Sequence, residues 1–236
     1  MLFAENIHWI FSWTLTTPKS PLDRGTSVAS LRNLQVAKLE GFFLYLCSMM
    51  NMDIRVQKKE IRSAIRELKQ CVDQAWMLQA SDSIMSQLES QDLFKAADTV
   101  LMYHALPDEV QTAAFLDKWY QSKRILIPLV SGDDLILKVY SPDKVVPGYK
   151  GIPEPSDDAE TVGPSEVELA VIPGVAFDRT CNRLGRGKGF YDRLIPSLRC
   201  PLVGLGFDFQ IVEQVPVEIF DRKLDMVITQ NRLFYR

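Results

Sequence analysis

Thr99-Val-Leu-Met-Tyr103 and Arg124-Ile-Leu-Ile-Pro-Leu-Val130 are two short apolar runs, rich in residues that favour β-strands. Residues 109–122 lie between them and place their large apolar side chains on one side of a helix. A strand, a helix and a second strand in this order form the unit from which parallel sheets are built. This stretch therefore predicts an α/β fold with a mostly parallel sheet.

Similar patterns continue on both sides of this unit. Residues 58–70 place Ile61, Ile65 and Leu68 at spacings of four and three, which predicts an amphipathic helix. Further helices are expected over residues 83–94 and 189–197, further strands over residues 134–140, 168–173, 201–207 and 226–229, and irregular structure over residues 142–164.

The composition narrows the class of protein. The chain has 236 residues, of which 47% are apolar and 24% charged, and we expect residues 52–236 to form one domain. A formal charge of −3 argues against an extended nucleic-acid surface, which needs an excess of Lys and Arg. The four cysteines contain no C-x-x-C pair, so neither a zinc site nor a disulfide framework is indicated, and a cytoplasmic location is expected. The most apolar stretch, residues 41–50, is much shorter than the roughly 20 residues that cross a bilayer. We therefore expect a monomer without a nucleic-acid or membrane partner.

Residues 1–51 have a poor hydrophobic period and lack the order of a signal peptide. Met50 and Met52 stand shortly before the helical run at residues 58–70. We expect residues 1–51 to be an N-terminal extension outside the fold, or the product of an upstream start, which mass spectrometry of the native N-terminus can distinguish.

Arg183-Leu-Gly-Arg-Gly-Lys-Gly189 is the stretch with the clearest chemistry. Its alternate glycines allow sharp turns that expose backbone N–H groups, while Arg183, Arg186 and Lys188 add positive charge. A helix that starts near Gly189 adds its unpaired N-terminal amides. The spacing matches neither a Walker A loop nor the Rossmann fingerprint. The loop therefore predicts a phosphate site of another kind, with a solvated turn as the structural alternative.

The sequence around this loop resembles a known family. Ile172-Pro-Gly-Val-Ala-Phe-Asp178 and Asn182-Arg-Leu-Gly-Arg-Gly-Lys-Gly-Phe-Tyr-Asp-Arg193 are similar to the signature of 5-formyltetrahydrofolate cyclo-ligase, also called methenyltetrahydrofolate synthetase. The resemblance runs from about Gln57 to the C-terminus and includes four further motifs: Lys58-x-x-x-Arg62, Pro107-Asp-Glu-Val-Gln-Thr112, Gly151-Ile-Pro-Glu-Pro155 and Asp221-Arg-Lys-Leu-Asp225. It implies a three-layer α/β/α sandwich, Rossmann-like but without the dinucleotide fingerprint.

The resemblance also implies a reaction, the ATP- and magnesium-dependent conversion of 5-formyltetrahydrofolate to 5,10-methenyltetrahydrofolate. Lys188 and Arg186 are the implied catalytic residues. The implied ATP-binding residues are Lys58, Lys59, Glu60, Ile61, Arg62, Arg183, Leu184, Gly185, Arg186, Gly187, Lys188, Gly189, Phe190 and Tyr191. The implied folate-binding residues are His104, Glu109, Arg186, Gly187, Lys188, Gly189 and Phe190, and the implied magnesium ligands are Asp192 and Asp225.

Three positions depart from the family pattern. Phe190 replaces a frequent tyrosine, which keeps an aromatic face but removes a hydroxyl group. Cys181 stands where glycine is common, so a left-handed backbone there would be strained. Phe220 stands where histidine is frequent.

Other interpretations stay open at this point. Lys58 and Arg62 can be solvated helix charges, Glu109 and Asp192 first-turn helix acids, and His104 a structural residue. The main functional alternative is a non-catalytic relative that binds folate or nucleotide. A sugar-phosphate or acyl-transfer enzyme needs a glutamate in a glycine-rich strand turn, and the sequence contains none.

Overall fold

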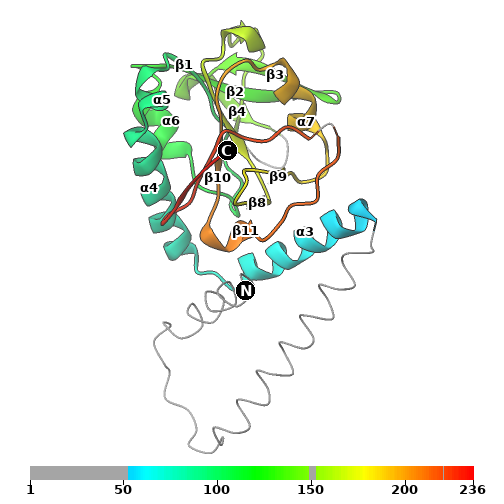
Figure 1. Cartoon of the computed structure of the whole chain (residues 1–236). Coiled ribbons are helices and arrows are strands. Elements are labelled where there is room, and N and C mark those ends of the chain that lie inside the picture. The colour runs from blue at the N-terminus through cyan, green and yellow to red at the C-terminus, as the bar shows by residue number, and fades with distance from the viewer. Residues whose placement is uncertain (1–52, 149–152, 220) are drawn as a thin grey trace, which may run out of the picture. The chain divides into compact units, whose positions relative to one another are not determined.

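The computed structural model describes residues 53–148, 153–219 and 221–236 (Figure 1). The expected N-terminal extension, residues 1–51, and the position of Phe220 lie outside these described residues. The predicted α/β fold with a mostly parallel sheet is confirmed. Its eight strands, in sheet order, are β13 (Leu233–Tyr235), β12 (Met226–Ile228), β10 (Leu202–Leu205), β7 (Leu169–Pro173), β1 (Thr99–Leu101), β2 (Arg124–Ser131), β3 (Asp134–Val139) and β6 (Thr161–Val162). Neighbouring strands from β12 to β2 are parallel, whereas β13, β3 and β6 are antiparallel to their neighbours.

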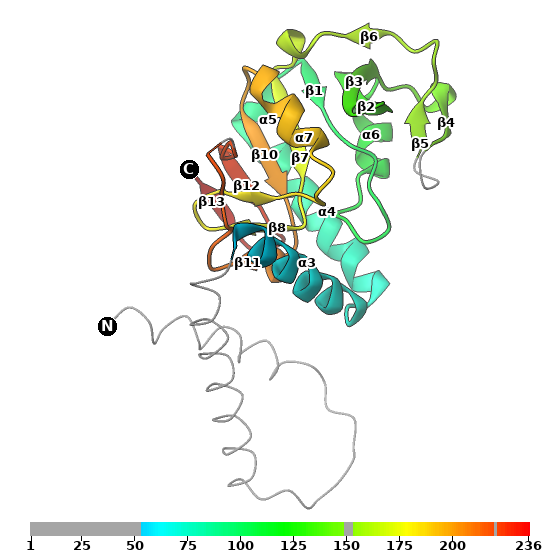
Figure 2. The same cartoon turned by 90° about the vertical axis from the view of Figure 1, so that its right-hand side faces the viewer.

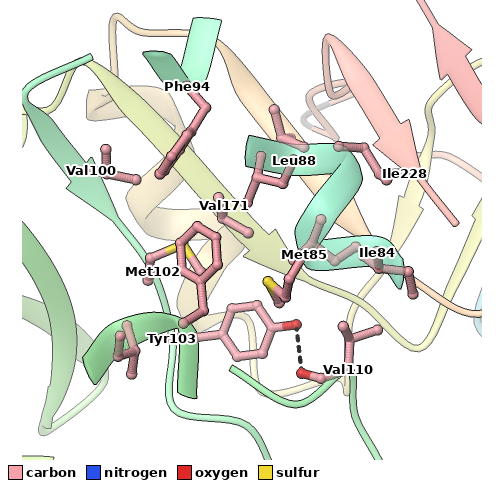
Figure 3. Close-up of a cluster of buried hydrophobic side chains, with 14 of the residues drawn as sticks. Ile84, Met85, Leu88, Phe94, Val100, Met102, Tyr103, Val110, Val171 and Ile228 are labelled. Carbon is pink, nitrogen blue, oxygen red and sulfur yellow. Dashed lines mark hydrogen bonds between the residues drawn. The ribbon is translucent and has the colours of Figure 1, made fainter. Parts of the chain in front are cut away.

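Helices cover both faces of this sheet (Figures 1 and 2). One face carries α4 (Gln74–Ser90), α5 (Asp92–Ala96) and α6 (Ala113–Trp119), and the other carries α7 (Phe190–Leu194) with a short 3₁₀ turn, η4 (Ile195–Ser197). Successive strand residues point to opposite faces. Val100 and Met102 therefore lie in the core beneath α4, α5 and α6 (Figure 3), and Leu101 lies in the core beneath α7. The three layers of the sandwich follow from this alternation.

The first described helix, α3 (Ile54–Gln70), confirms the helix expected over residues 58–70. Its start is capped by Asp53, whose carboxylate accepts a hydrogen bond from the Arg55 amide at 2.7 Å. Ile61 and Ile65 are buried, but Leu68 is 44% exposed, so the buried stripe is shorter than the sequence indicated. The apolar packing of α3 against the rest of the domain is therefore made by its central turns.

α3 packs against a second, three-stranded sheet with the order β11 (Ile211–Val212), β8 (Ala176–Asp178) and β9 (Arg183–Leu184). A two-stranded sheet, β4 (Val145–Pro147) with β5 (Pro153–Pro155), lies within the segment that the sequence indicated as irregular, and that part of the expectation was wrong. Strands of two or three residues are too short to show a period. Both small sheets were therefore missed.

The Phe177 ring fills a slot lined by three glycines. A Cβ atom built on Gly174, Gly204 or Gly206 would lie 2.5, 2.6 or 2.9 Å from this ring, closer than carbon atoms approach. None of the three has a positive φ, so they provide space rather than an unusual backbone. The slot fixes β8, and with it the start of the glycine-rich loop, against β7 and β10.

Candidate active site

The glycine-rich loop follows β9 and lies beside the carboxyl end of β7. The buried Arg183 side chain donates to the Pro173 carbonyl oxygen at 2.9 Å and pairs with the Asp192 carboxylate. Gly187 has φ +94° and Gly189 has φ +75°, which confirms sharp turns at two of the three alternate glycines. The start of the loop is thus fixed by the contacts of Arg183, and its second half turns sharply at Gly187 and Gly189.

The helix expected over residues 189–197 is shorter than predicted. α7 spans five residues, and the chain continues as the 3₁₀ turn η4 because Pro196 cannot continue the α-helical hydrogen bonding. A macrodipole depends on aligned peptide units, so this short helix adds little to it. Positive charge at the loop must therefore come mainly from side chains.

Arg186 joins the loop to the implied folate-binding acid. Its Nε donates to Glu109 Oε1 at 2.8 Å, and its Nη2 donates to Asp108 Oδ1 at 2.7 Å. Glu109 is 9% exposed, and its other oxygen accepts from the Leu106 amide at 3.0 Å. Burial alone would lower the pKa of Arg186, but the two carboxylates outweigh burial and raise it. The structure thus brings together two residues, 77 positions apart, that the family resemblance assigned to one site.

Helix α3 supplies Lys58 and Arg62 on one face. Arg62 Nε donates to the Gly185 carbonyl oxygen at 2.8 Å, which places this guanidinium directly at the loop. Burial lowers the pKa of Arg62, and the nearby Asp192 carboxylate opposes that shift. Lys58 donates instead to Glu218 Oε2 and Asp221 Oδ2, both at 2.8 Å.

The other α3 positions implied in ATP binding differ in exposure. Lys59 is exposed, Glu60 is half-buried, and the Ile61 side chain lies in the core against the second sheet. Burial alone would lower the pKa of Lys58, but its two carboxylate partners raise it, so Lys58 is a firmly charged residue at the edge of the site.

The far end of the loop presents an unpaired cation beside aromatic rings. Lys188 is exposed, and no ion pair or hydrogen bond involves its ammonium group within the described ranges. The Arg193 guanidinium lies over the Phe190 ring at 5.5 Å, and Arg183 lies over the Tyr191 ring at 5.8 Å. Lys188 is therefore available to a ligand, whereas Phe190 already has a cation on one face.

The two implied magnesium ligands lie at different ends of the sheet. Asp192 pairs with Arg183 near the carboxyl end of β7 and is half-exposed. Asp225 accepts from the Leu202 amide at 2.9 Å, at the amino end of β10. Leu202 and Leu205 are three residues apart, and Leu205 pairs with Pro173, so the two ends are separated by about 10 Å along the strands. The structure does not bring Asp225 to the loop.

Asp178 organises the turn that leads into the loop, a role the sequence analysis missed. Its carboxylate is 2% exposed and accepts from the amides of Thr180, Asn182 and Val215 at 2.9 to 3.0 Å, and from the side chains of Thr180 and Asn182. Burial alone would raise the pKa of Asp178, but these donors outweigh burial and lower it. A carboxylate that accepts from an amide two residues later is an Asx turn, and Asp178-Arg-Thr180 was the available signal.

This turn contains the backbone strain expected at Cys181. Cys181 has φ +64°, the left-handed conformation that favours glycine. The Cys181 amide donates to the Asp178 carbonyl oxygen at 3.0 Å, and the Leu224 amide donates to the Cys181 carbonyl oxygen at 2.9 Å. Burial raises the pKa of the Cys181 thiol, so it stays protonated and unreactive. Hydrogen bonds on both sides therefore hold a non-glycine residue in a conformation it disfavours.

His104 has an unsatisfied nitrogen. Its Nε2 is buried and has no hydrogen-bond partner in the described structure, and its ring lies edge-on to Tyr140 at 5.7 Å. Burial lowers the pKa of His104, and the Asp117 carboxylate opposes this shift. A buried polar atom without a partner costs about 1–3 kcal/mol. The unsatisfied Nε2 of His104 therefore destabilises the fold, and a ligand that forms a hydrogen bond with it would remove this cost.

We expect His104→Leu to leave the free energy of unfolding unchanged or to raise it by about 1 kcal/mol at pH 7, since it removes the unsatisfied atom. A lowered pKa means that the folded state favours neutral His104, so wild-type stability falls as the pH drops below the ordinary value of 6.5. The advantage of the variant should therefore grow between pH 7.5 and pH 5.5 in urea unfolding. A variant that is less stable at both pH values contradicts this account.

Comparison with known proteins places this geometry in a family. The model of the 5-formyltetrahydrofolate cyclo-ligase family matches residues 54–230. The chain belongs to this family. The cyclo-ligase of Escherichia coli K12 is 32% identical over 147 residues, which cover 58% of this chain and 81% of the relative. The mouse cyclo-ligase is 24% identical over 204 residues, which cover 78% of this chain and 98% of the relative.

A solved cyclo-ligase structure supports the same assignment. The 5,10-methenyltetrahydrofolate synthetase of Aquifex aeolicus has a TM-score of 0.70 and 31% identity, and the match covers 75% of this chain and 92% of that one. Within the described residues, no helix is long and apolar enough to cross a membrane.

Proposed function

We propose that this chain uses ATP to cyclise 5-formyltetrahydrofolate to 5,10-methenyltetrahydrofolate, with release of ADP and phosphate. Membership of the cyclo-ligase family supports the overall reaction. The observation that carries the site is the contact between Arg186 and Glu109, because it joins the phosphate-binding loop to the implied folate-binding acid. We propose residues 52–236 as the catalytic domain, acting as a cytoplasmic monomer.

The chemistry explains why such a site needs dense positive charge. The formyl carbonyl on N5 is a weak electrophile, and its oxygen is a poor leaving group. Attack of that oxygen on the γ-phosphorus of ATP releases ADP and gives an iminium phosphate. The N10 lone pair then attacks the formyl carbon, N10 loses its proton, and the formyl oxygen leaves with the phosphate. The protein must position two polyanions and stabilise the transferring phosphoryl group.

Each part of the loop has a proposed role in this sequence. Lys188 is the cation nearest the transferring phosphoryl group, since its ammonium is exposed and unpaired among the described residues. Arg186 contacts both substrates from its position on Glu109. Backbone amides from Arg183 to Tyr191 bind nucleotide phosphates, with Arg62 beside them and Lys58, Lys59 and Glu60 at the edge. His104 and Phe190 form part of the folate-binding wall.

Magnesium fits this site as an ion that arrives with the nucleotide. Mg²⁺ takes one or two carboxylates together with phosphate oxygens and waters. No group of three or more His, Cys, Asp or Glu side chains suited to a metal ion occurs in the described part of the chain. Asp192 supplies an exposed carboxylate at the loop and is the better placed of the two proposed ligands, because Asp225 lies at the other end of the sheet. When bound, the ion neutralises charge on the phosphates.

A direct assay tests the proposed function. Purified protein with 5-formyltetrahydrofolate, ATP and magnesium should develop the near-ultraviolet absorbance of the conjugated methenyl product, and omission of ATP should abolish the signal. Folate binding without product formation would favour the alternative, a non-catalytic relative. A parallel measurement of ADP release separates cyclisation from simple ATP hydrolysis, because cyclisation requires one ADP per methenyl product.

A further inference from the structure

A cleft beside the glycine-rich loop carries an excess of positive charge. Its volume is about 100 Å³, and it is partly open to solvent. Side chains from α3, the loop and two neighbouring turns line the cleft: Arg62, Ile65, Arg66, Lys69, Asp108, Val175 and Arg186. Four of these seven side chains are cations and one is an acid. Neither Arg66 nor Lys69 belongs to the implied site.

Partners neutralise only part of this charge. Asp108 pairs with Lys69 at 2.9 Å and with Arg186 at 2.7 Å. Arg62 donates its Nε to a neutral carbonyl oxygen, so its charge is not balanced by that bond. Arg66 is exposed and takes part in no hydrogen bond or ion pair among the residues that the structure describes. The Asp192 carboxylate lies near Arg62 but pairs with Arg183, so the two cleft cations without a direct acidic partner are Arg62 and Arg66.

The helix places these two arginines next to each other. Arg62 and Arg66 are four residues apart on α3, so they share one face and one side of the cleft. Two like charges at this spacing destabilise a helix slightly, and an anion between them reverses that effect. Guanidinium groups bind the paired oxygens of phosphates and carboxylates with two parallel hydrogen bonds. Asp108 accepts from Lys69 and Arg186, and it makes no hydrogen bond with Arg66 in the described structure.

We propose that Arg66 and Arg62 together bind an oxyanion group of one substrate in this cleft. This inference rests on the proposed function for the identity of the ligand, which carries either phosphates, as in ATP, or the glutamate carboxylates of the folate. Arg66 then extends the anion site by one turn of α3 beyond the loop. It is a substrate-binding residue rather than a solvated surface charge.

Calorimetric titration with two simple anions tests the inference without turnover. Inorganic tripolyphosphate represents the nucleotide, and a γ-linked triglutamate peptide represents the folate tail. We expect Arg66→Ala to weaken binding of at least one of them about tenfold, and Arg66→Lys to have a smaller effect because it keeps the charge but not the paired hydrogen bonds. Arg199→Ala is the matched control, since Arg199 is also exposed and makes no hydrogen bond or ion pair in the described structure.

The two probes separate the sources of the anion. Weaker binding of tripolyphosphate alone assigns the cleft to the nucleotide, and weaker binding of triglutamate alone assigns it to the folate. An affinity of Arg66→Ala that equals wild type for both probes overturns the inference, as does a wild-type protein that binds neither. If the cyclisation assay gives no product but probe binding still depends on Arg66, the result supports the anion site and contradicts the proposed reaction.

Discussion

Lys188→Ala should lower kcat for methenyltetrahydrofolate formation about 10- to 150-fold. A hydrogen bond from a charged group contributes about 1.5–3 kcal/mol, and each 1.36 kcal/mol in the barrier changes the rate tenfold. The loss should fall on kcat more than on the KM for folate, because charge on the phosphoryl group develops in the transition state. Steady-state kinetics with both substrates varied measures this division.

The control for Lys188 is Lys95→Ala, which removes the same charge from α5 on the opposite face of the sheet. Lys95 is exposed, and we expect its variant to retain wild-type rates. If Lys188→Ala and Lys95→Ala give the same kcat within twofold, Lys188 does not act on the transferring group. Lys188→Arg should recover part of the lost rate, since it restores the charge at a different reach.

Asp178→Ala should lower the free energy of unfolding by about 3 kcal/mol or more. The substitution leaves buried amides at Asn182 and Val215 without their acceptor, and each unsatisfied buried donor costs about 1–3 kcal/mol. Asp178 also holds the turn with Cys181 at positive φ, so the strain there loses its restraint. Urea unfolding at pH 7 measures the loss.

Glu168→Ala provides a comparison at the other end of the sheet. Glu168 also accepts from two backbone amides, those of Asp98 and Thr99, but it is exposed, so water can replace it. Its loss should therefore cost clearly less than the loss of Asp178. Because the pKa of Asp178 is lowered in the folded state, the stability it contributes is present above its ordinary pKa and is lost as the pH falls through the folded pKa. Equal losses for the two variants would contradict a special role for Asp178.

Much of the fold was predictable because long apolar runs report burial directly. Residues 99–103 and 125–127 are buried between the two cores, and so read as continuous apolar strands, whereas Val130 near the end of β2 is exposed. The helix expected at residues 109–122 starts only at Ala113. Glu109 bonds back to the Leu106 amide and closes a turn there, and this competition between a side chain and a helix start has no periodic signal.

The candidate site was predictable only in part. Alternate glycines and cations identified the loop, and the family pattern identified Glu109 as its companion. The contacts themselves join residues far apart in sequence, such as Lys58 with Glu218 and Asp221, and single-sequence patterns do not encode such pairs. For the same reason, the sequence did not indicate a role for Arg66 or Lys69. Whether a charged side chain on a helix lines a cleft depends on which segments pack against that helix, and these segments are distant in the sequence.

The glycine slot around Phe177 also limits how relatives of this chain can diverge. Gly174, Gly204 and Gly206 lie on three separate segments, yet each is restricted by the same ring. An alanine at any of them requires the Phe177 ring to shift. Phe177 directly precedes Asp178 in the chain, and the hydrogen bonds of Asp178 hold the turn at the start of the loop. A smaller side chain at position 177 would remove the main restriction on Gly174 and Gly206, whereas Gly204 would still be restricted by Leu224, whose Cδ1 lies 2.6 Å from the same added Cβ. We therefore expect substitutions at position 177 and at the three glycine positions to be correlated across the family, even without direct contact between the glycines.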